Sequence, residues 1–174
     1  MRRFLTGIAA TALAAMPASA ALRVGAPAPN IVTTGAVGGK PFRLNLKEQL
    51  RKGPVVLYFF PKAFTQGCTL EARAFSEKIG EFRKAGAQVV GMSSDDLPTL
   101  QKFSVEECRS AFPVATAAPG TIKAYDVALK QKDGLTDRTS YVIDRRGRIA
   151  FVHSDLDWSE HVQKTLAAVK ALKR

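Results

Sequence analysis

The chain has 174 residues and a mass of 18.8 kDa, the size of one ordinary domain, with 46% hydrophobic and 24% charged residues. This average composition excludes disordered, collagen-like and coiled-coil proteins. No apolar run reaches the roughly 18 residues of a membrane span, and two cysteines are too few for a disulfide miniprotein or a four-cysteine zinc site. The formal net charge of +11 favours anionic partners, but the basic residues are scattered. We therefore predict a soluble cationic surface, with no nucleic-acid partner and no stable membrane insertion.

The first twenty residues have the three parts of a secretory signal. Met1 to Arg3 form a basic head, Phe4 to Met16 form an apolar run, and Ala18-Ser19-Ala20 supplies an A-x-A cleavage pattern. We expect cleavage after Ala20, a single domain over residues 21–174, and export, in a bacterium to the periplasm. The arginine pair leaves twin-arginine export open, although the general secretion route fits better.

Strand and helix patterns alternate along the rest of the chain. Residues 55–60 are six consecutive β-formers bounded by turn residues, which predicts a strand covered on both faces. Apolar spacings of four and three predict a helix over 68–85. The other expected elements are a hairpin (31–34 and 42–46), a strand (87–93), a helix (97–107), a strand (112–115), a helical turn (121–125), a second hairpin (138–144 and 149–153) and a closing helix (159–172). This order predicts an α/β fold with an N-terminal β-hairpin and a mostly parallel central sheet flanked by helices.

One cysteine lies at the turn between the buried strand and the helix at 68–85. Cys68 falls in the first turn of that helix, where unpaired backbone N–H groups favour a thiolate over a thiol. It also lies on the apolar stripe of the helix, so the sulfur should face the protein interior. Position alone leaves two interpretations open: a sheltered nucleophile, or a buried cysteine that acts as a small apolar residue.

The residues around this turn resemble a known family. Pro61-x-x-x-Thr65-x-x-Cys68 matches the P-x-x-x-T-x-x-C signature of the peroxiredoxins of the AhpC/TSA type, which are thiol peroxidases. The segments 58–62 and 67–72 look most like the PrxQ or bacterioferritin-comigratory-protein branch. The segment 138–144 (RTSYVID) is similar to the family's R-S-T-F-L-I-D, and the opening at 24–29 is also family-like. The resemblance implies a thioredoxin-like fold.

The resemblance assigns roles to five residues. Cys68 would be the peroxidatic cysteine, which attacks a hydroperoxide and becomes a sulfenic acid. Thr65 would place its hydroxyl beside the sulfur and the peroxide, Arg138 would bring a permanent positive charge, and Pro61 would shield the pocket from water. Glu71 resembles a residue that supports the arginine and is expected to be auxiliary.

The identity of the resolving thiol stays open in the sequence. Many family members carry a second cysteine five residues after the first, where this chain has Arg73. In some members of the branch the resolving cysteine lies on the later helix, so the resemblance implies Cys108 as the resolving residue here. If Cys108 is instead a plain core cysteine, the resolving role falls to a second protein, or the enzyme uses a one-cysteine mechanism.

The predicted function is reduction of hydrogen peroxide and organic hydroperoxides, with no bound cofactor and a thioredoxin-like dithiol protein as reductant. The missing C-terminal extension of dimeric members suggests a monomer. A thiol-disulfide oxidoreductase of the same fold and a non-catalytic cationic binding module are the alternatives. Four potential ligands, His153, Asp155, Asp157 and His161, lack a closed metal spacing; they are interpreted as polar capping before the last helix, so no metal site is predicted.

Overall fold

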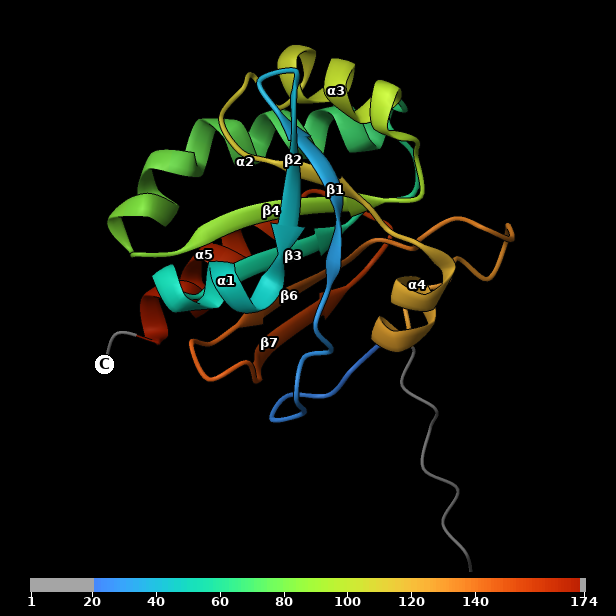
Figure 1. Cartoon of the computed structure of the whole chain (residues 1–174). Helices are drawn as coiled ribbons and strands as arrows, with labels where there is room; N and C mark the ends of the chain where they lie inside the picture. The colour runs from blue at the N-terminus through green and yellow to red at the C-terminus, as the bar shows by residue number, and fades with distance from the viewer. Residues whose placement is uncertain (1–20, 173–174) are drawn as a thin grey trace, which may run out of the picture.

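A computed structural model describes residues 21–172 (Figure 1). The predicted signal peptide therefore lies outside the described residues. Within them the elements, in chain order, are β1 (Val32–Val37), β2 (Lys40–Asn45), α1 (Leu46–Lys52), β3 (Val55–Phe59), α2 (Gln66–Lys84), β4 (Gln88–Ser93), α3 (Leu97–Glu106), β5 (Val114–Thr116), α4 (Pro119–Tyr125), β6 (Thr139–Ile143), β7 (Ile149–Ser154) and α5 (His161–Ala171). The predicted order of strands and helices is confirmed, with α1 as an addition.

The strands of this part of the chain form one seven-stranded sheet in the order β2-β1-β5-β4-β3-β6-β7. Parallel pairing is confined to β3 with β4 and β4 with β5, which α2 and α3 connect as crossover helices. All other pairings in the described sheet are antiparallel. The prediction of a mostly parallel sheet was therefore wrong, because β1 and β6 insert beside β5 and β3 in the opposite direction, and such long-range pairing leaves no mark on local sequence patterns.

Strand β3 is the centre of the core and is buried on both faces, as predicted. One face carries Val56 and Tyr58, which pack with α2, α3 and α5. The opposite face carries Val55, Leu57 and Phe59, which pack with α1 and α4. Figure 1 shows the sheet between these two helical layers. The carboxyl end of β3 is consequently fixed by both layers at the point where α2 begins.

Helix α2 begins at Gln66, two residues before the predicted start, with Thr65 as its N-cap residue. The first helical bond runs from the Thr69 N–H to the Thr65 carbonyl. The helix ends at Lys84, and Gly86 follows with a left-handed φ of 78°, a conformation that glycine adopts without strain. Cys68 thus lies in the first turn, as predicted.

Helix α1 was not predicted, because seven residues are too few to show helical periodicity. A local signal was present in Asn45 and Glu48. The Asn45 side chain accepts a hydrogen bond from Lys47 N–H at 3.1 Å and donates one to Glu48 at 2.9 Å. An Asn followed three residues later by Glu is the pattern of a reciprocal helix cap.

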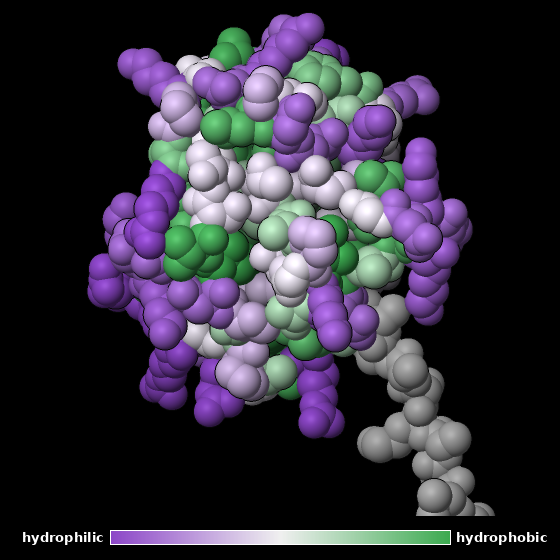
Figure 2. Space-filling model, turned by 45° about the vertical axis from the view of Figure 1, so that its right-hand side comes forward, coloured by the Kyte–Doolittle hydropathy of each residue, from purple (hydrophilic) through white to green (hydrophobic). Residues whose placement is uncertain are grey.

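The surface carries no concentrated apolar belt on the face seen in Figure 2, where hydrophilic side chains project around most of the outline and hydrophobic patches between them are small. Among the described residues, no helix combines the length and apolar character required to cross a bilayer.

Two glycines give a matched test of the packing. A Cβ at Gly35 would lie 2.5 Å from the Val114 carbonyl oxygen, so Gly35→Ala must push β1 away from β5; we expect a loss of about 1–3 kcal/mol in the free energy of unfolding. A Cβ at Gly80 on α2 meets nothing within 4 Å, so Gly80→Ala should add about 0.5–1 kcal/mol through helix propensity. Urea unfolding of both variants measures the two effects, and equal changes in both would contradict this packing.

Candidate active site

The sulfur of Cys68 is sheltered inside the protein at the N-terminus of α2. The side chain is 1% exposed and packs in the core between the sheet and α2. Because Thr69 makes the first helical bond, the N–H groups of Gln66, Gly67 and Cys68 lie at the positive end of the helix dipole. The helix dipole supplies a favourable local field for a negative charge at this position, and burial keeps the sulfur from bulk water.

Arg138 reaches this sulfur from a segment seventy residues further along the chain. It directly precedes β6, whose residue Thr139 pairs with Phe59 at the end of β3, so the pairing brings the arginine to the start of α2. Its Nη2 lies 3.5 Å from Cys68 Sγ, and its side chain is 6% exposed. A permanent charge at this distance stabilises a thiolate.

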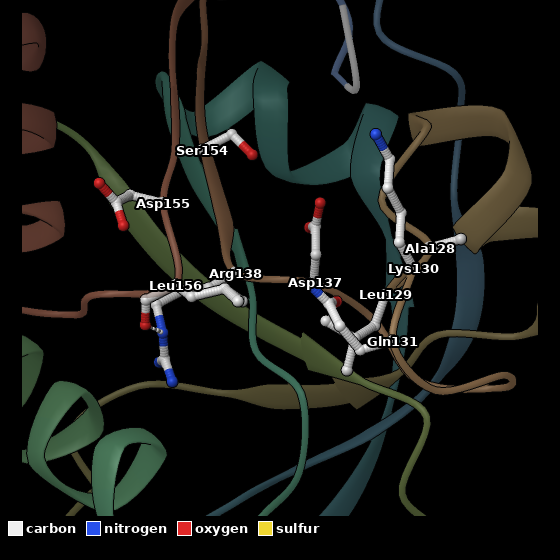
Figure 3. Close-up of a pocket in the computed structure, with 9 residues that line it drawn as sticks. All are labelled: Ala128, Leu129, Lys130, Gln131, Asp137, Arg138, Ser154, Asp155 and Leu156. Atoms are coloured by element: carbon white, nitrogen blue, oxygen red, sulfur yellow. Dashed lines mark hydrogen bonds between the residues drawn. The ribbon is translucent and has the colours of Figure 1, made fainter.

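Two further contacts fix the Arg138 guanidinium. Its Nε donates to the Leu156 carbonyl at 2.9 Å, the contact shown by a dashed line in Figure 3. Its Nη1 donates to Glu71 Oε2, one helical turn beyond Cys68. Gly67 allows the close approach, because a Cβ there would lie 3.1 Å from Nη2. The guanidinium is therefore oriented before any substrate binds.

Glu71 is completely buried beside the arginine. Burial raises the pKa of its carboxyl to about 8, although the charge and hydrogen bond of Arg138 act in the opposite direction. The second carboxyl oxygen, Oε1, lies 3.8 Å from His161 Nδ1. The structure thus brings Cys68, Arg138 and Glu71 together, as the motif resemblance implied, and adds a histidine that was not expected there.

Thr65 and Pro61 lie in the exposed turn that leads into α2. The Thr65 hydroxyl donates to the Lys62 carbonyl at 2.9 Å, which leaves its oxygen free to accept a hydrogen bond from a peroxide O–H. Pro61 follows the end of β3 and is partly exposed. Phe64 adopts a left-handed φ of 64°, an unusual conformation for a bulky residue and one often associated with functional sites.

This turn is held by Asp95, which lies in the short connection between β4 and α3. Its Oδ2 accepts hydrogen bonds from the Ala63 N–H at 2.7 Å and the Ser93 hydroxyl at 2.8 Å. Asp96 is the actual cap of α3. The Asp95 contact spans two strand ends, so no local pattern could have identified it.

Cys108 lies two residues after the end of α3 and shares the core on the Cys68 side of the sheet, where it is 0% exposed. Burial and the neighbouring Glu107 charge raise the pKa of its thiol. Ser76 donates to its carbonyl at 2.9 Å. The next two residues, Arg109 and Ser110, have left-handed φ values of 50° and 56°. Both cysteines are free thiols in this conformation.

The four possible ligands near the last helix separate into two kinds. Asp155 and Asp157 accept backbone N–H bonds within their own loop, which agrees with the capping interpretation. His161 does not cap; it is the first residue of α5, is completely buried and faces Glu71. The capping prediction was therefore wrong for His161, and also for His153, which lies within β7 with its ring 4.5 Å from that of His161. Within residues 21–172 no cluster of three metal-binding side chains is found.

A pocket of about 250 Å³ borders the other side of Arg138 (Figure 3). It lies between segments 128–131 and 154–156, with Asp137 at its wall. In Figure 3 the Arg138 guanidinium points away from the Asp137 carboxylate. Cys68 does not line this pocket, so the pocket adjoins the arginine and not the sulfur.

Comparison with known proteins agrees with this geometry. The AhpC/TSA family matches residues 24–152. A chloroplastic peroxiredoxin Q of Triticum aestivum is 31% identical over 173 residues, covering 90% of this chain and 79% of the relative. A putative peroxiredoxin of Mycobacterium tuberculosis is 35% identical over 142 residues, covering 78% of this chain and 88% of the relative.

Solved structures confirm the predicted α/β, thioredoxin-like fold. Peroxidoxin BcpB of Mycobacterium tuberculosis superposes with a TM-score of 0.77 at 32% identity, covering 88% of this chain and 99% of the other. AhpC of the same organism superposes with a TM-score of 0.76 at 24% identity, covering 88% of this chain and 94% of the other, which shows a likeness of fold. The chain therefore belongs to the AhpC/TSA family of peroxiredoxins, and its similarity to peroxiredoxin Q confirms the branch that the sequence motifs indicate.

Proposed function

We propose that Cys68 is the peroxidatic cysteine through which this thiol-dependent peroxidase reduces hydrogen peroxide and organic hydroperoxides. The observation that carries the proposal is the buried sulfur at a helix N-terminus with Arg138 Nη2 at 3.5 Å. A core cysteine that merely fills space would need neither a buried cation nor a guanidinium fixed by two other partners.

The first step follows from this arrangement. The Cys68 thiolate attacks one peroxide oxygen; an S–O bond forms and the O–O bond breaks, so sulfur is oxidised to a sulfenic acid and the peroxide is reduced. The departing hydroxide or alkoxide takes up a proton and leaves as water or alcohol. Arg138 donors and the Thr65 hydroxyl would hold the two oxygens in line, a contribution of positioning and charge stabilisation.

We propose Cys108 as the resolving thiol. Its sulfur would attack the sulfenic acid, forming a Cys68–Cys108 disulfide and releasing water, and a thioredoxin-like dithiol protein would reduce that disulfide. Both side chains lie in the same core but are buried, so local opening must precede the bond. The first turn of α2 and the left-handed residues Arg109 and Ser110 are the segments expected to open most easily.

We further propose that residues 1–20 direct export, in a bacterium to the periplasm, and that the enzyme acts as a monomer. The basic head, apolar run and A-x-A pattern support the first proposal. Determination of the N-terminal residue of the secreted protein tests the cleavage after Ala20, and light scattering tests the monomer.

Intact mass spectrometry tests the mechanism directly. With one equivalent of hydrogen peroxide, the reduced protein should lose about two mass units as the disulfide forms. Cys108→Ser should instead gain about 16 mass units on Cys68, and Cys68→Ser should not react. Wild-type protein that gains oxygen without forming a bridge would contradict the role of Cys108. A lack of reaction within minutes would contradict the peroxidase.

Loss of the planar guanidinium of Arg138 should slow the oxidation of Cys68 by peroxide. Arg138→Lys keeps a positive charge but loses the planar donors that contact Cys68, Glu71 and Leu156, so the rate constant for Cys68 oxidation should fall about 10²- to 10³-fold. The fluorescence of Trp158, which lies beside Gly67, offers a stopped-flow signal. The matched control is Arg109→Lys on the exposed surface; an equal fall there would refute the assignment.

The Cys108 segment is tied to α2 by Arg73, the residue at the usual resolving position. Arg73 Nε lies 2.7 Å from Glu107 Oε2, with the arginine side chain 46% exposed. Arg73→Gln should accelerate disulfide formation, but no more than about five-fold, because a half-exposed ion pair contributes up to about 1 kcal/mol. Quenched-flow mass analysis measures the rate. Lys102→Gln, whose surface partner Glu106 lies 3.9 Å away, is the control and should leave the rate unchanged.

A further inference from the structure

His161 is a buried titratable residue that the mechanism above does not use. Its Nε2 lies 2.9 Å from the Asp155 carbonyl oxygen. A carbonyl can only accept, so Nε2 carries a proton and donates it. In the neutral ring Nδ1 is then an acceptor, and the Ser140 hydroxyl, 2.8 Å away, donates to it. Both ring nitrogens are thus oriented by fixed partners.

The acceptor side of this ring faces Glu71. Oε2 of the carboxyl receives Arg138 Nη1, whereas Oε1 is buried without a hydrogen-bond partner among the described residues. Oε1 lies 3.8 Å from His161 Nδ1. Without a proton, Oε1 is a buried acceptor with no donor, beside an Nδ1 whose one lone pair receives the Ser140 hydroxyl, which is an unfavourable arrangement. A proton on Oε1 lets the carboxyl donate to Nδ1 after a small approach, once the Ser140 hydroxyl turns its O–H away from that lone pair.

The charge balance of the buried groups also favours one proton between Glu71 and His161. Arg138 supplies one positive charge to the buried set of Arg138, Cys68, Glu71 and His161. With a Cys68 thiolate and a Glu71 carboxylate the set would carry a net negative charge, whereas one added proton makes it neutral. A second histidine ring, that of His153 on β7, lies beside the His161 ring. The other ionisable groups that face Glu71 or these two rings are Tyr58 on β3, Asp155 and Asp157 in the loop after β7, Glu160 before α5 and Lys164 on α5.

We propose that His161 is a positioning residue that shares one proton with Glu71, so that the neutral Glu71 leaves the charge of Arg138 to the Cys68 thiolate. The inference rests on the proposed peroxidase function of Cys68. His161 touches neither the sulfur nor the substrate; it acts through Glu71 and Arg138.

The direction of both pKa shifts agrees with this assignment. Burial raises the pKa of Glu71 to about 8 and lowers the pKa of His161 to about 4, so at neutral pH the proton resides on the carboxyl. As the pH rises through about 8, Glu71 becomes a carboxylate. The Glu71 carboxylate then competes with the Cys68 thiolate for Arg138, and the two negative charges repel each other. Cys68 oxidation should consequently slow on the alkaline side.

The pH profile of Cys68 oxidation by hydrogen peroxide tests the proposal. The wild-type rate constant should fall as pH rises through about 8. Glu71→Gln, which mimics the protonated acid, should lack this fall. His161→Phe removes the acceptor and should move the fall to lower pH by about one unit. His153→Phe makes the same change in the adjacent ring, 4.5 Å away, and should keep the wild-type profile.

A long-range ¹⁵N–¹H correlation spectrum of the reduced wild-type protein gives a readout that needs neither a variant nor activity. At pH 7 it should show His161 protonated on Nε2 and unprotonated on Nδ1. A proton on Nδ1, an alkaline fall that persists in Glu71→Gln, or a profile unmoved in His161→Phe would overturn the proposal. Wild-type protein that does not react with peroxide would overturn the peroxidase function instead, and the tautomer would still be measured.

Discussion

The site depends on one buried guanidinium. Arg138 is 6% exposed and divides its donors among the Cys68 sulfur, the Glu71 carboxyl and the Leu156 carbonyl. A buried cation is costly unless such partners satisfy it. The partners come from α2 and from the loop after β7, and the cation itself comes from the start of β6. The antiparallel pairing of β6 with β3 is therefore the structural requirement for the chemistry, more than any feature of the cysteine helix alone.

The same guanidinium creates a conflict between stability and reactivity. A charged Glu71 would satisfy Arg138 best, but it would also weaken the support of the thiolate. Since burial raises the pKa of Glu71 from 4.5 to about 8, the folded state holds a proton that the unfolded chain has lost. The stabilisation from this group is present below the unfolded pKa and is lost as the pH rises toward about 8. On the proposed assignment, the lower stability at alkaline pH arises at the same residue that leaves the charge of Arg138 to the thiolate.

Sequence patterns predicted the features that depend on residues close together in the chain. The two-sided burial of β3, the helix over Cys68 and the turn from Pro61 to Thr65 all follow from apolar spacing and turn residues close together in the chain. Arg138 was identified through a motif, not through its environment. The sheet order and the buried His161 were missed, because both depend on pairings between segments far apart in the chain. Nothing in the local sequence distinguishes a histidine that caps a helix from one that faces a buried carboxyl.

The burial that protects Cys68 also determines how the enzyme can complete a cycle. Cys108 lies in the same core and the ring of Tyr58, close to both cysteines, has its hydroxyl buried without a partner in the described structure. The proposed Cys68–Cys108 disulfide would require this packing to open, and the opening would have to follow oxidation, because an earlier one would admit water to the thiolate. Conversion of the thiolate to a neutral sulfenic acid removes the negative charge that Arg138 supports. On the proposed mechanism, the first turn of α2 would then lose its electrostatic contact with Arg138 when it has to move, so oxidation itself would favour the conformation in which Cys108 reaches Cys68.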